Sequence, residues 1–133
     1  MTDPNNPCIF CDVKKKDIIY ENEYALVSYD SYPVSKFHSL IIPKRHIKNF
    51  FDLNDKELNA CNELIKKIKS KIENDDNLVE GFNLGTNAGS VAGQTIMHCH
   101  IHLIPRRRGD VENPQGGVRG VIPLKQHYLR KSK

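Results

Sequence analysis

A regular alternation of polar and apolar residues marks positions 98–104, which read His-Cys-His-Ile-His-Leu-Ile. In an extended strand, successive side chains point to opposite faces, so His98, His100 and His102 share one face, each roughly 6.6 Å from the next. The apolar positions, beginning with Met97, take the other face, which suits a buried core. A helix would turn each residue by about 100° and scatter the histidines, so the pattern predicts a strand.

Three interpretations are open for this row of histidines. It is the polar face of a solvent-exposed strand, a metal site of the kind that short histidine tracts form, or a set of catalytic residues. Histidine is not a preferred strand residue, which counts against the first interpretation. A neutral imidazole is available near pH 7, because its reference pKa is about 6.5. It can attack phosphorus and leave again from a phosphohistidine intermediate, so metal binding and catalysis both remain.

Further patterns predict four more strands and one helix. The strands are expected at 18–20, 24–30, 38–43 and 81–87, each bounded by turn residues or proline. Asn54 and Glu57 have the spacing of a capping box, in which each side chain accepts from the other residue's backbone N–H. An apolar stripe follows at steps of three and four and predicts an amphipathic helix of about five turns, ending near 74–76: Leu58, Cys61, Ile65, Ile68 and Ile72.

Two segments lack such patterns. Residues 87–93 form a loop of small residues, which is either an ordinary hairpin loop or a place where a ligand approaches backbone N–H groups. Pro105 is expected to end the strand of histidines. Beyond it, residues 109–133 carry little pattern except at 118–122, so we expect a tail that covers a site or reaches a partner subunit.

Length and charge narrow the class of protein. A chain of 133 residues predicts one domain with a single core. The formal charge of +4 favours anionic ligands, and without a basic stripe interleaved with aromatic residues we rank nucleic acid low as a partner. The apolar runs are too short to span a membrane. Residues 1–7 form a polar, flexible lead-in, so we expect a cytoplasmic protein with no membrane partner.

Four cysteines are present, and two of them are close in sequence. In a reducing compartment the spacing Cys8-x-x-Cys11 indicates a metal or redox site rather than a structural disulfide. As a zinc half-site it needs two further ligands from elsewhere in the chain. Cys61 falls in the apolar stripe of the helix and is expected to pack there.

Taken together, these residues resemble the histidine-triad (HIT) family of nucleotide-binding proteins. The resemblance rests on the triad followed by two apolar residues and on further motifs in the family's order: Cys8-x-x-Cys11, Asp30 at a strand end, residues 38–46, residues 92–95 and Pro105-Arg106. It covers roughly residues 8–108, which we expect to form a HIT domain between the lead-in and the tail. It implies an α+β fold, with an antiparallel sheet of about five strands flanked by helices, in a single domain that forms a homodimer.

The resemblance also implies a role for each matching residue. His100 would be the nucleophile on the α-phosphorus of an adenine nucleotide, and His102 would hold the phosphate. His38 would pack beside the nucleophile and help to orient it. The remaining nucleotide contacts would come from polar positions that match the family, with an acidic residue on the ribose hydroxyls and the others near the phosphate: Asp30, Asn87, Gln94 and Thr95.

A structural zinc site is a further implication, with Cys8, Cys11, His46 and His98 as ligands. Two cysteines and two histidines suit a closed tetrahedral site. The alternative is a site without zinc, in which the cysteines are simply packed or oxidised. One position departs from the family, because Phe37 stands where glycine is common, and the tight turn before His38 is therefore not implied by the resemblance.

The residues after the triad point to one branch of the family. Ile104-Pro105-Arg106-Arg107 with Gly109-Asp110, and residues 113–119, resemble dinucleoside-polyphosphate hydrolases. The first hypothesis is hydrolysis of a substrate such as diadenosine tetraphosphate through a covalent AMP–histidine intermediate, with Mg²⁺ on the polyphosphate. Four arginines would contact the outer phosphates or form a solvated basic surface: Arg106, Arg107, Arg108 and Arg119.

Two alternatives use the same residues. One is a phosphoramidase that acts on adenosine 5′-phosphoramidate or on aminoacyl adenylates, where the leaving amine must be protonated. The other is a nucleotide-binding interaction module with little turnover. A complete triad counts against the second, because binding alone has no need of the nucleophile.

Overall fold

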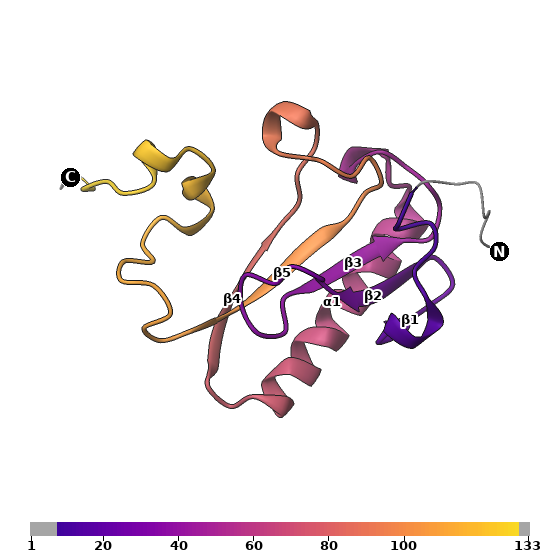
Figure 1. The fold of residues 1–133 in the computed structure, drawn as a ribbon, viewed down its shortest axis with the longest axis horizontal. Coiled ribbons are helices and arrows are strands. Elements are labelled where there is room, and N and C mark those ends of the chain that lie inside the picture. The colour runs from indigo at the N-terminus through magenta and orange to yellow at the C-terminus, as the bar shows by residue number, and fades with distance from the viewer. Residues whose placement is uncertain (1–7, 131–133) are drawn as a thin grey trace.

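Five antiparallel strands form one sheet, and a single long helix crosses one of its faces (Figure 1). This computed structural model describes residues 8–130, so the lead-in expected at 1–7 and the last three residues of the tail lie outside it. The strands are arranged in the order β1-β2-β3-β5-β4. Their bounds are β1 Tyr20–Glu21, β2 Ala25–Tyr29, β3 Ser39–Pro43, β4 Val79–Gly85 and β5 Ile101–Arg107. The predicted α+β class and five-stranded sheet are confirmed.

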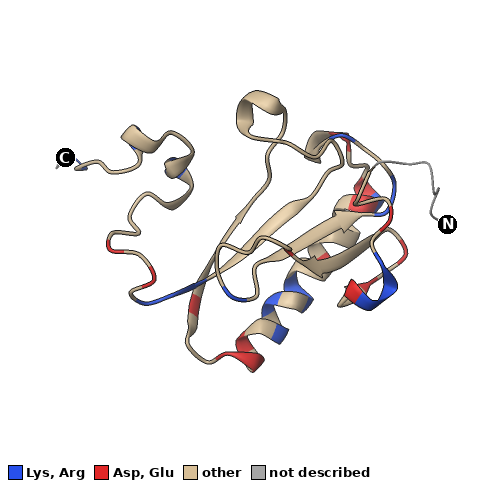
Figure 2. Ribbon diagram, in the orientation of Figure 1, with Lys and Arg blue, Asp and Glu red and all other residues tan. Residues whose placement is uncertain are grey.

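Helix α1 (Asp55–Asp75) begins with the predicted capping box. The Glu57 N–H donates to Asn54 Oδ1 at 2.9 Å, and the Asn54 N–H donates to Glu57 Oε1 at 3.0 Å. The buried stripe is centred differently from the prediction, since Leu64 is buried and Leu58 is 41% exposed. At 100° per residue, the stripe through Ala60, Cys61, Leu64, Ile68 and Ile72 leaves position 58 at its edge. On the solvent side, basic and acidic residues follow one another along the helix (Figure 2).

Two apolar clusters lie on opposite faces of the sheet. The larger one joins the stripe of α1 to strand residues on its side: Ala25, Val27, Ile41, Ile101 and Leu103. On the other face, Leu26, Leu40 and Ile42 are covered by the N-terminal segment through Phe10, Val13 and Ile18. In the register of β3 and β5, Leu40 lies opposite His102, so His102 is on the face away from α1.

The strand of histidines is shifted from its predicted position. β5 begins at Ile101 and continues through Pro105 to Arg107, so only His102 of the three histidines lies in a strand. The segment before it is held elsewhere, because the Cys99 N–H donates to Ile47 O at 2.8 Å. Met97 is 38% exposed rather than part of a buried face.

Proline is tolerated inside β5 for a local reason. Pairing of β5 with β3 ends at Leu103, opposite Ser39. The Pro105 carbonyl accepts a hydrogen bond from Ser35 Oγ at 2.9 Å, beyond the end of β3. The nitrogen of a strand residue faces the same side as its carbonyl, so the missing N–H breaks no bond of the sheet. The neighbouring β4 is also displaced from 81–87, which leaves Asn87 in the loop beyond the strand.

After β5 the chain turns back and ends in a compact C-terminal segment, here residues 109–130, drawn in yellow at its end in Figure 1. It contains two short 3-10 helices, η4 (Gly117–Val121) and η5 (Pro123–Lys125), of which η4 lies near β4. Within residues 8–130, no helix combines the length and the apolar character needed to cross a membrane.

The capping box gives a direct test of how α1 begins. Replacing Asn54 with Ala removes the acceptor for the Glu57 N–H and should lower the free energy of unfolding by about 1 kcal/mol. The matched control is Asn62→Ala, an exposed position inside the same helix, where the change should stay within about 0.5 kcal/mol. Urea unfolding followed by circular dichroism measures both. Equal stability of the two variants would show that the cap contributes nothing.

Candidate active site

Four cysteine and histidine side chains meet beside the row of histidines. One ligand atom from each of Cys8, Cys11, His46 and His98 lies within 4.8 Å of the others. Sγ of Cys8 and Sγ of Cys11 are each 3.4 Å from His98 Nδ1. His46 Nδ1 lies 3.0 Å from Cys11 Sγ and 3.1 Å from His98 Nδ1. Ligand atoms around a tetrahedral zinc ion are separated by about 3.3–3.8 Å, so the group has nearly the spacing that a metal needs.

The orientation of His98 fits a metal ligand. This fully buried ring has Nε2 2.8 Å from the Pro43 carbonyl, which can only accept, so Nε2 carries the proton. Nδ1 therefore has its lone pair directed at the cluster. Burial lowers the pKa of His98, which keeps the ring neutral near pH 7. These four residues could hold a metal ion.

His100 presents the opposite nitrogen. Its Nδ1 lies 2.8 Å from the carbonyl of His98 and must carry the proton, because a carbonyl oxygen accepts. In the neutral ring Nε2 is then an unprotonated nitrogen with an available lone pair. The Phe10 ring packs edge-on against the imidazole, with centroids 4.8 Å apart. His100 thus has the tautomer and the support that a nucleophile requires.

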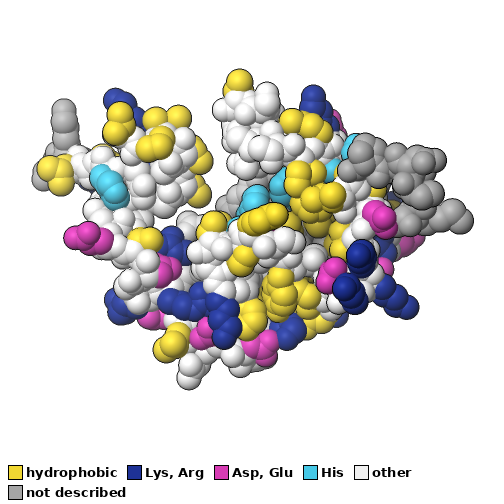
Figure 3. Space-filling view, in the orientation of Figure 1, with side chains coloured by type: hydrophobic (Ala, Val, Ile, Leu, Met, Phe, Trp, Pro, Cys, Tyr) yellow, Lys and Arg dark blue, Asp and Glu magenta, His cyan; other side chains and the backbone are white. Residues whose placement is uncertain are grey.

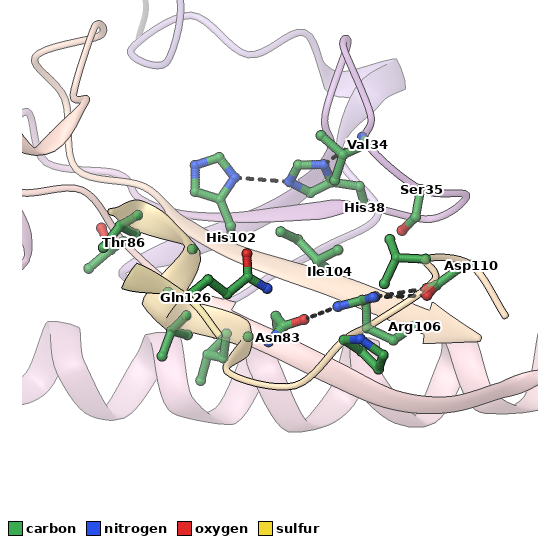
Figure 4. Close-up of a pocket in the computed structure, with 18 of the residues that line it drawn as sticks. Val34, Ser35, His38, Asn83, Thr86, His102, Ile104, Arg106, Asp110 and Gln126 are labelled. Carbon is green, nitrogen blue, oxygen red and sulfur yellow. Dashed lines mark hydrogen bonds and ion pairs between the residues drawn. The ribbon is translucent and has the colours of Figure 1, made fainter. Parts of the chain in front are cut away.

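His38 and His102 form a pair whose proton positions follow from one backbone amide. The Val34 N–H donates to His38 Nδ1 at 3.1 Å, so the proton of neutral His38 is on Nε2. That Nε2–H donates to His102 Nδ1 at 2.9 Å, shown as a dashed line in Figure 4. His102 therefore keeps its own proton on Nε2, where it can donate to a ligand.

Burial is the largest influence on the pKa of both rings. It lowers the pKa of His38 and of His102, whereas the Asp30 carboxylate opposes the shift. Asp30 Oδ2 lies 3.5 Å from His38 Nε2 and 3.9 Å from His102 Nδ1. These three residues are also close enough to surround a cation. Their protonation does not suit a cation. The Val34 amide donates to His38 Nδ1, so the proton of the ring is on Nε2, the nitrogen that would face the metal.

A cavity of about 930 Å³ opens in front of His100 and His102. Asp30, Asn87 and Thr95 line it with them, so the structure brings together most of the residues expected to contact a nucleotide. Gln94 is not among its lining residues. Its buried amide accepts from the Gly89 N–H and donates to the carbonyls of Lys48 and Ile96, which fixes the loop that carries Asn87 and Thr95.

Sequence reasoning missed two contributors to this site, Phe10 and the Val34 amide, and left open the turn at a third, Phe37. Phe10 lies between the two cysteines, and its position in the Cys-x-x-Cys motif was the only signal. The Val34 amide belongs to the backbone, so no side chain could reveal it. Phe37 adopts φ of +71°, the left-handed region where glycine is preferred, so the turn forms without glycine at a cost of about 1–2 kcal/mol. Its ring packs against Tyr29 at 5.7 Å between centroids, which offsets that cost.

Three alternating histidines that lead into β5 of a five-stranded antiparallel sheet, with a Cys/His cluster beside them, define a histidine-triad protein. The sequence model of the HIT domain matches residues 12–109, and the chain belongs to the HIT domain family. Members of this family are nucleotide-binding hydrolases and transferases that act on phosphorus–oxygen or phosphorus–nitrogen bonds.

Similar proteins come from all domains of life. An uncharacterised HIT-like protein of Methanocaldococcus jannaschii is 41% identical over 110 residues, covering 79% of this chain and 83% of that protein. The adenosine 5′-monophosphoramidase of Schizosaccharomyces pombe is 35% identical over 103 residues, covering 74% of each. An adenylylsulfatase of Arabidopsis thaliana is 35% identical over 109 residues, covering 79% of this chain and 55% of that protein.

Solved structures agree with the fold. A HIT family protein from Bacillus anthracis superposes with a TM-score of 0.72 at 30% identity, covering 96% of this chain and 83% of that one. A zinc-bound histidine triad family protein from Mycobacterium smegmatis gives a TM-score of 0.71 at 31% identity, covering 80% of each chain.

The environment of His38 predicts its titration. Its pKa should lie below 6.5, because burial outweighs the attraction of Asp30. Asp30→Asn removes that attraction and should lower the pKa of His38 further, whereas Glu63→Gln, on the exposed side of α1, should not change it. Histidine ring resonances followed by NMR from pH 4 to pH 8 give the pKa of His38 in the wild type and in both variants. A His38 pKa above 6.5, or one that rises in Asp30→Asn, would contradict this account.

Proposed function

We propose that this chain hydrolyses adenine nucleotides or dinucleotides at the α-phosphorus, through a covalent nucleotidyl-histidine intermediate on His100. The observation that carries the proposal is the 2.8 Å contact between His100 Nδ1 and the His98 carbonyl. It leaves His100 Nε2 as the acceptor nitrogen, in a residue that lines the 930 Å³ cavity. A neutral imidazole held in this tautomer needs no base to become a nucleophile.

Two chemical steps follow from this arrangement. His100 Nε2 forms a bond to the α-phosphorus while the bond from phosphorus to the leaving atom breaks, and the leaving group takes the electron pair. The ring then carries positive charge, which the Nδ1–H contact with the His98 carbonyl stabilises. Water next attacks phosphorus, gives up a proton to solvent and releases AMP, and the electron pair returns to His100.

The surrounding residues would position the nucleotide. His102 Nε2–H donates to a phosphate oxygen, and His38 keeps that proton in place through its own hydrogen bond. Asp30 would accept from the ribose hydroxyls, and Asn87 and Thr95 would contact the phosphate from the cavity wall. Gln94 would act indirectly, by fixing the loop that carries them.

Two leaving groups have separate support. The residues after the triad resemble dinucleoside-polyphosphate hydrolases, for which diadenosine tetraphosphate with Mg²⁺ is the model substrate. The named relatives from Schizosaccharomyces pombe and Arabidopsis thaliana are instead a monophosphoramidase and an adenylylsulfatase. The first of these names supports adenosine 5′-phosphoramidate as a substrate about as well as the residues after the triad support a dinucleoside polyphosphate. In both reactions the leaving group departs from the same phosphorus, and aminoacyl adenylates stay an alternative substrate.

Zinc is our proposal for the Cys/His cluster. Cys8, Cys11, His46 and His98 would hold it, and the zinc-bound structure from Mycobacterium smegmatis supports this choice of metal. Bound there, zinc would fix the N-terminal segment to His98 and would take no part in the reaction. Through the His98 carbonyl it would also fix the position of the nucleophile.

A homodimer remains a proposal as well. Of the two edge strands, β1 and β4, the second carries Leu84, which is 48% exposed, and Leu78 just before it is 67% exposed. Strand edges and apolar side chains of this kind suit pairing with a second copy.

The covalent intermediate can be trapped. Rapid acid-free quenching during turnover of adenosine 5′-phosphoramidate should give a protein carrying one adenylyl group on the peptide that contains His100. His100→Asn should abolish the adduct and reduce turnover by at least about a thousandfold, whereas the exposed His127→Asn should behave like the wild type. AMP binding without turnover in the wild type would instead identify a nucleotide-binding module.

Metal content tests the Cys/His cluster. Elemental analysis should find one zinc per chain in the wild type and in Cys61→Ala, whose cysteine is buried in the core beneath α1. Cys11→Ser should lose the metal and melt at a lower temperature, because binding energy at a structural zinc site contributes to folding. Equal zinc content in Cys11→Ser and the wild type would contradict the assignment.

A further inference from the structure

The loop between β2 and β3 determines how His38 is held, although much of it lies at the surface. Val34, whose N–H donates to His38 Nδ1 at 3.1 Å, is itself 73% exposed. Figure 4 shows Val34 and Ser35 on the side of His38 that faces away from His102. Packing of the exposed Val34 side chain therefore does little to keep its amide in place.

The backbone of this loop does not hold its turn unaided. The His38 N–H donates to the Ser35 carbonyl at 3.1 Å and closes the turn. Phe37, inside the turn, adopts φ of +71°, in the left-handed region that a side chain disfavours. A conformation of this kind persists only where the surrounding structure fixes it, so the loop depends on contacts from other elements.

Two such contacts come from the end of β5. Ser35 Oγ donates to the Pro105 carbonyl at 2.9 Å, and Arg107 Nη2 donates to the Lys36 carbonyl at 3.1 Å. Both lie beyond Leu103, where the pairing of β3 with β5 ends. Side chains thus take over from the ladder of the sheet and join the loop to β5.

Arg107 is in turn fixed by Asp76, at the end of α1. Its Nε and Nη2 donate to Asp76 Oδ2 at 3.1 Å and 3.0 Å. The other oxygen of that carboxylate accepts from the Leu78 N–H at 2.9 Å. The two charged side chains are mostly covered, so their attraction is little screened by water. Arg107 therefore connects three elements: the end of α1, the end of β5 and the loop before His38.

The position of the Val34 amide limits what the His38 ring can do. Its N–H can donate to Nδ1 only while that nitrogen lacks a proton, so the contact favours the neutral ring. His38 Nε2–H then donates to His102 Nδ1 at 2.9 Å. Among the described residues, Asp30 beside the end of β2 and His102 on β5 are the ionisable groups that contact the ring.

His102 depends on this support because it lies at the opening of the site. Figure 3 shows histidine side chains in a row across one face of the molecule, with hydrophobic side chains beside them. The side chain of His102 is 24% exposed, whereas that of His38 is 4% exposed. Packing alone does not fix a partly exposed ring, so the hydrogen bond from His38 orients it.

We propose that Ser35 and Arg107 are positioning residues for the reaction at His100. By anchoring the loop to β5 they keep the Val34 N–H on His38, which holds the His38 ring neutral and directs Nε2 at His102. Their effect on turnover rests on the proposed function, in which His102 holds the phosphate. Their effect on His38 is a property of the free protein and needs no substrate.

Two pairs of variants separate the anchors from general effects of substitution. Ser35→Ala removes the hydroxyl that donates to Pro105, and Ser35→Thr keeps it. Arg107→Gln shortens the side chain and removes the guanidinium that joins Asp76 to the loop. Arg108→Gln breaks the neighbouring ion pair with Glu80 and leaves the loop untouched. Ser35→Ala and Arg107→Gln are the loss variants, and the other two are the controls.

NMR of the free, metal-loaded protein gives the first measurement. Both loss variants should raise the pKa of His38 by about 0.5 or more, because the Val34 N–H no longer favours the neutral ring. Hydrogen exchange of the Val34 amide should become at least about fivefold faster. The controls should match the wild type in both properties. Should Arg107→Gln fail to fold, the Ser35 pair decides.

Turnover of adenosine 5′-phosphoramidate gives the second measurement. Both loss variants should lower kcat/KM by about fivefold or more, and both controls should stay within about twofold of the wild type. An unchanged pKa of His38 in the loss variants, or an equal change in Ser35→Thr, would overturn the anchoring. A raised pKa with unchanged kcat/KM would overturn the role in the reaction. A wild type that forms no adduct on His100 would overturn the proposed function, while the measurements on His38 would still test the anchoring.

Discussion

Hydrogen bonds from the backbone fix which ring nitrogen of the site's histidines carries the proton. The Pro43 carbonyl binds Nε2 of His98, the His98 carbonyl binds Nδ1 of His100, and the Val34 N–H binds Nδ1 of His38. Each bond commits one nitrogen and leaves the other a single role: acceptor toward the metal cluster, acceptor toward phosphorus, or donor to His102. The chemical distinction among these histidines thus comes from the main chain.

These bonds also connect the metal cluster to the nucleophile. The ring of His98 belongs to the Cys/His cluster, and its carbonyl accepts from His100. A displacement of the cluster would therefore also move the nucleophile. The segment that carries both is held by the Cys99 N–H on Ile47 and by the Gln94 amide on Lys48. A distortion of the chain after β3 would therefore affect cluster and nucleophile together.

The face of the sheet away from α1 is shared between the two ends of the chain. The N-terminal segment covers the side of β2 and β3, and the C-terminal segment covers the side of β4 and β5. His102 lies where the two meet, because β5 lies between β3 and β4 in the order β1-β2-β3-β5-β4.

The sequence by itself determined the five strands, the capped helix and the side chains of both candidate sites, because alternation, helical periodicity and motif spacing are local properties. It placed the strand of histidines three residues too early and expected proline to end it, since register depends on where β3 stops pairing. It left open whether the arginines after the triad contact phosphates or solvent, because Asp76 and Glu80, the partners of Arg107 and Arg108, are distant in sequence. The histidine tautomers and the ion pairs of Arg107 and Arg108 were decided only by tertiary structure, because backbone carbonyls, amides and distant carboxylates set them.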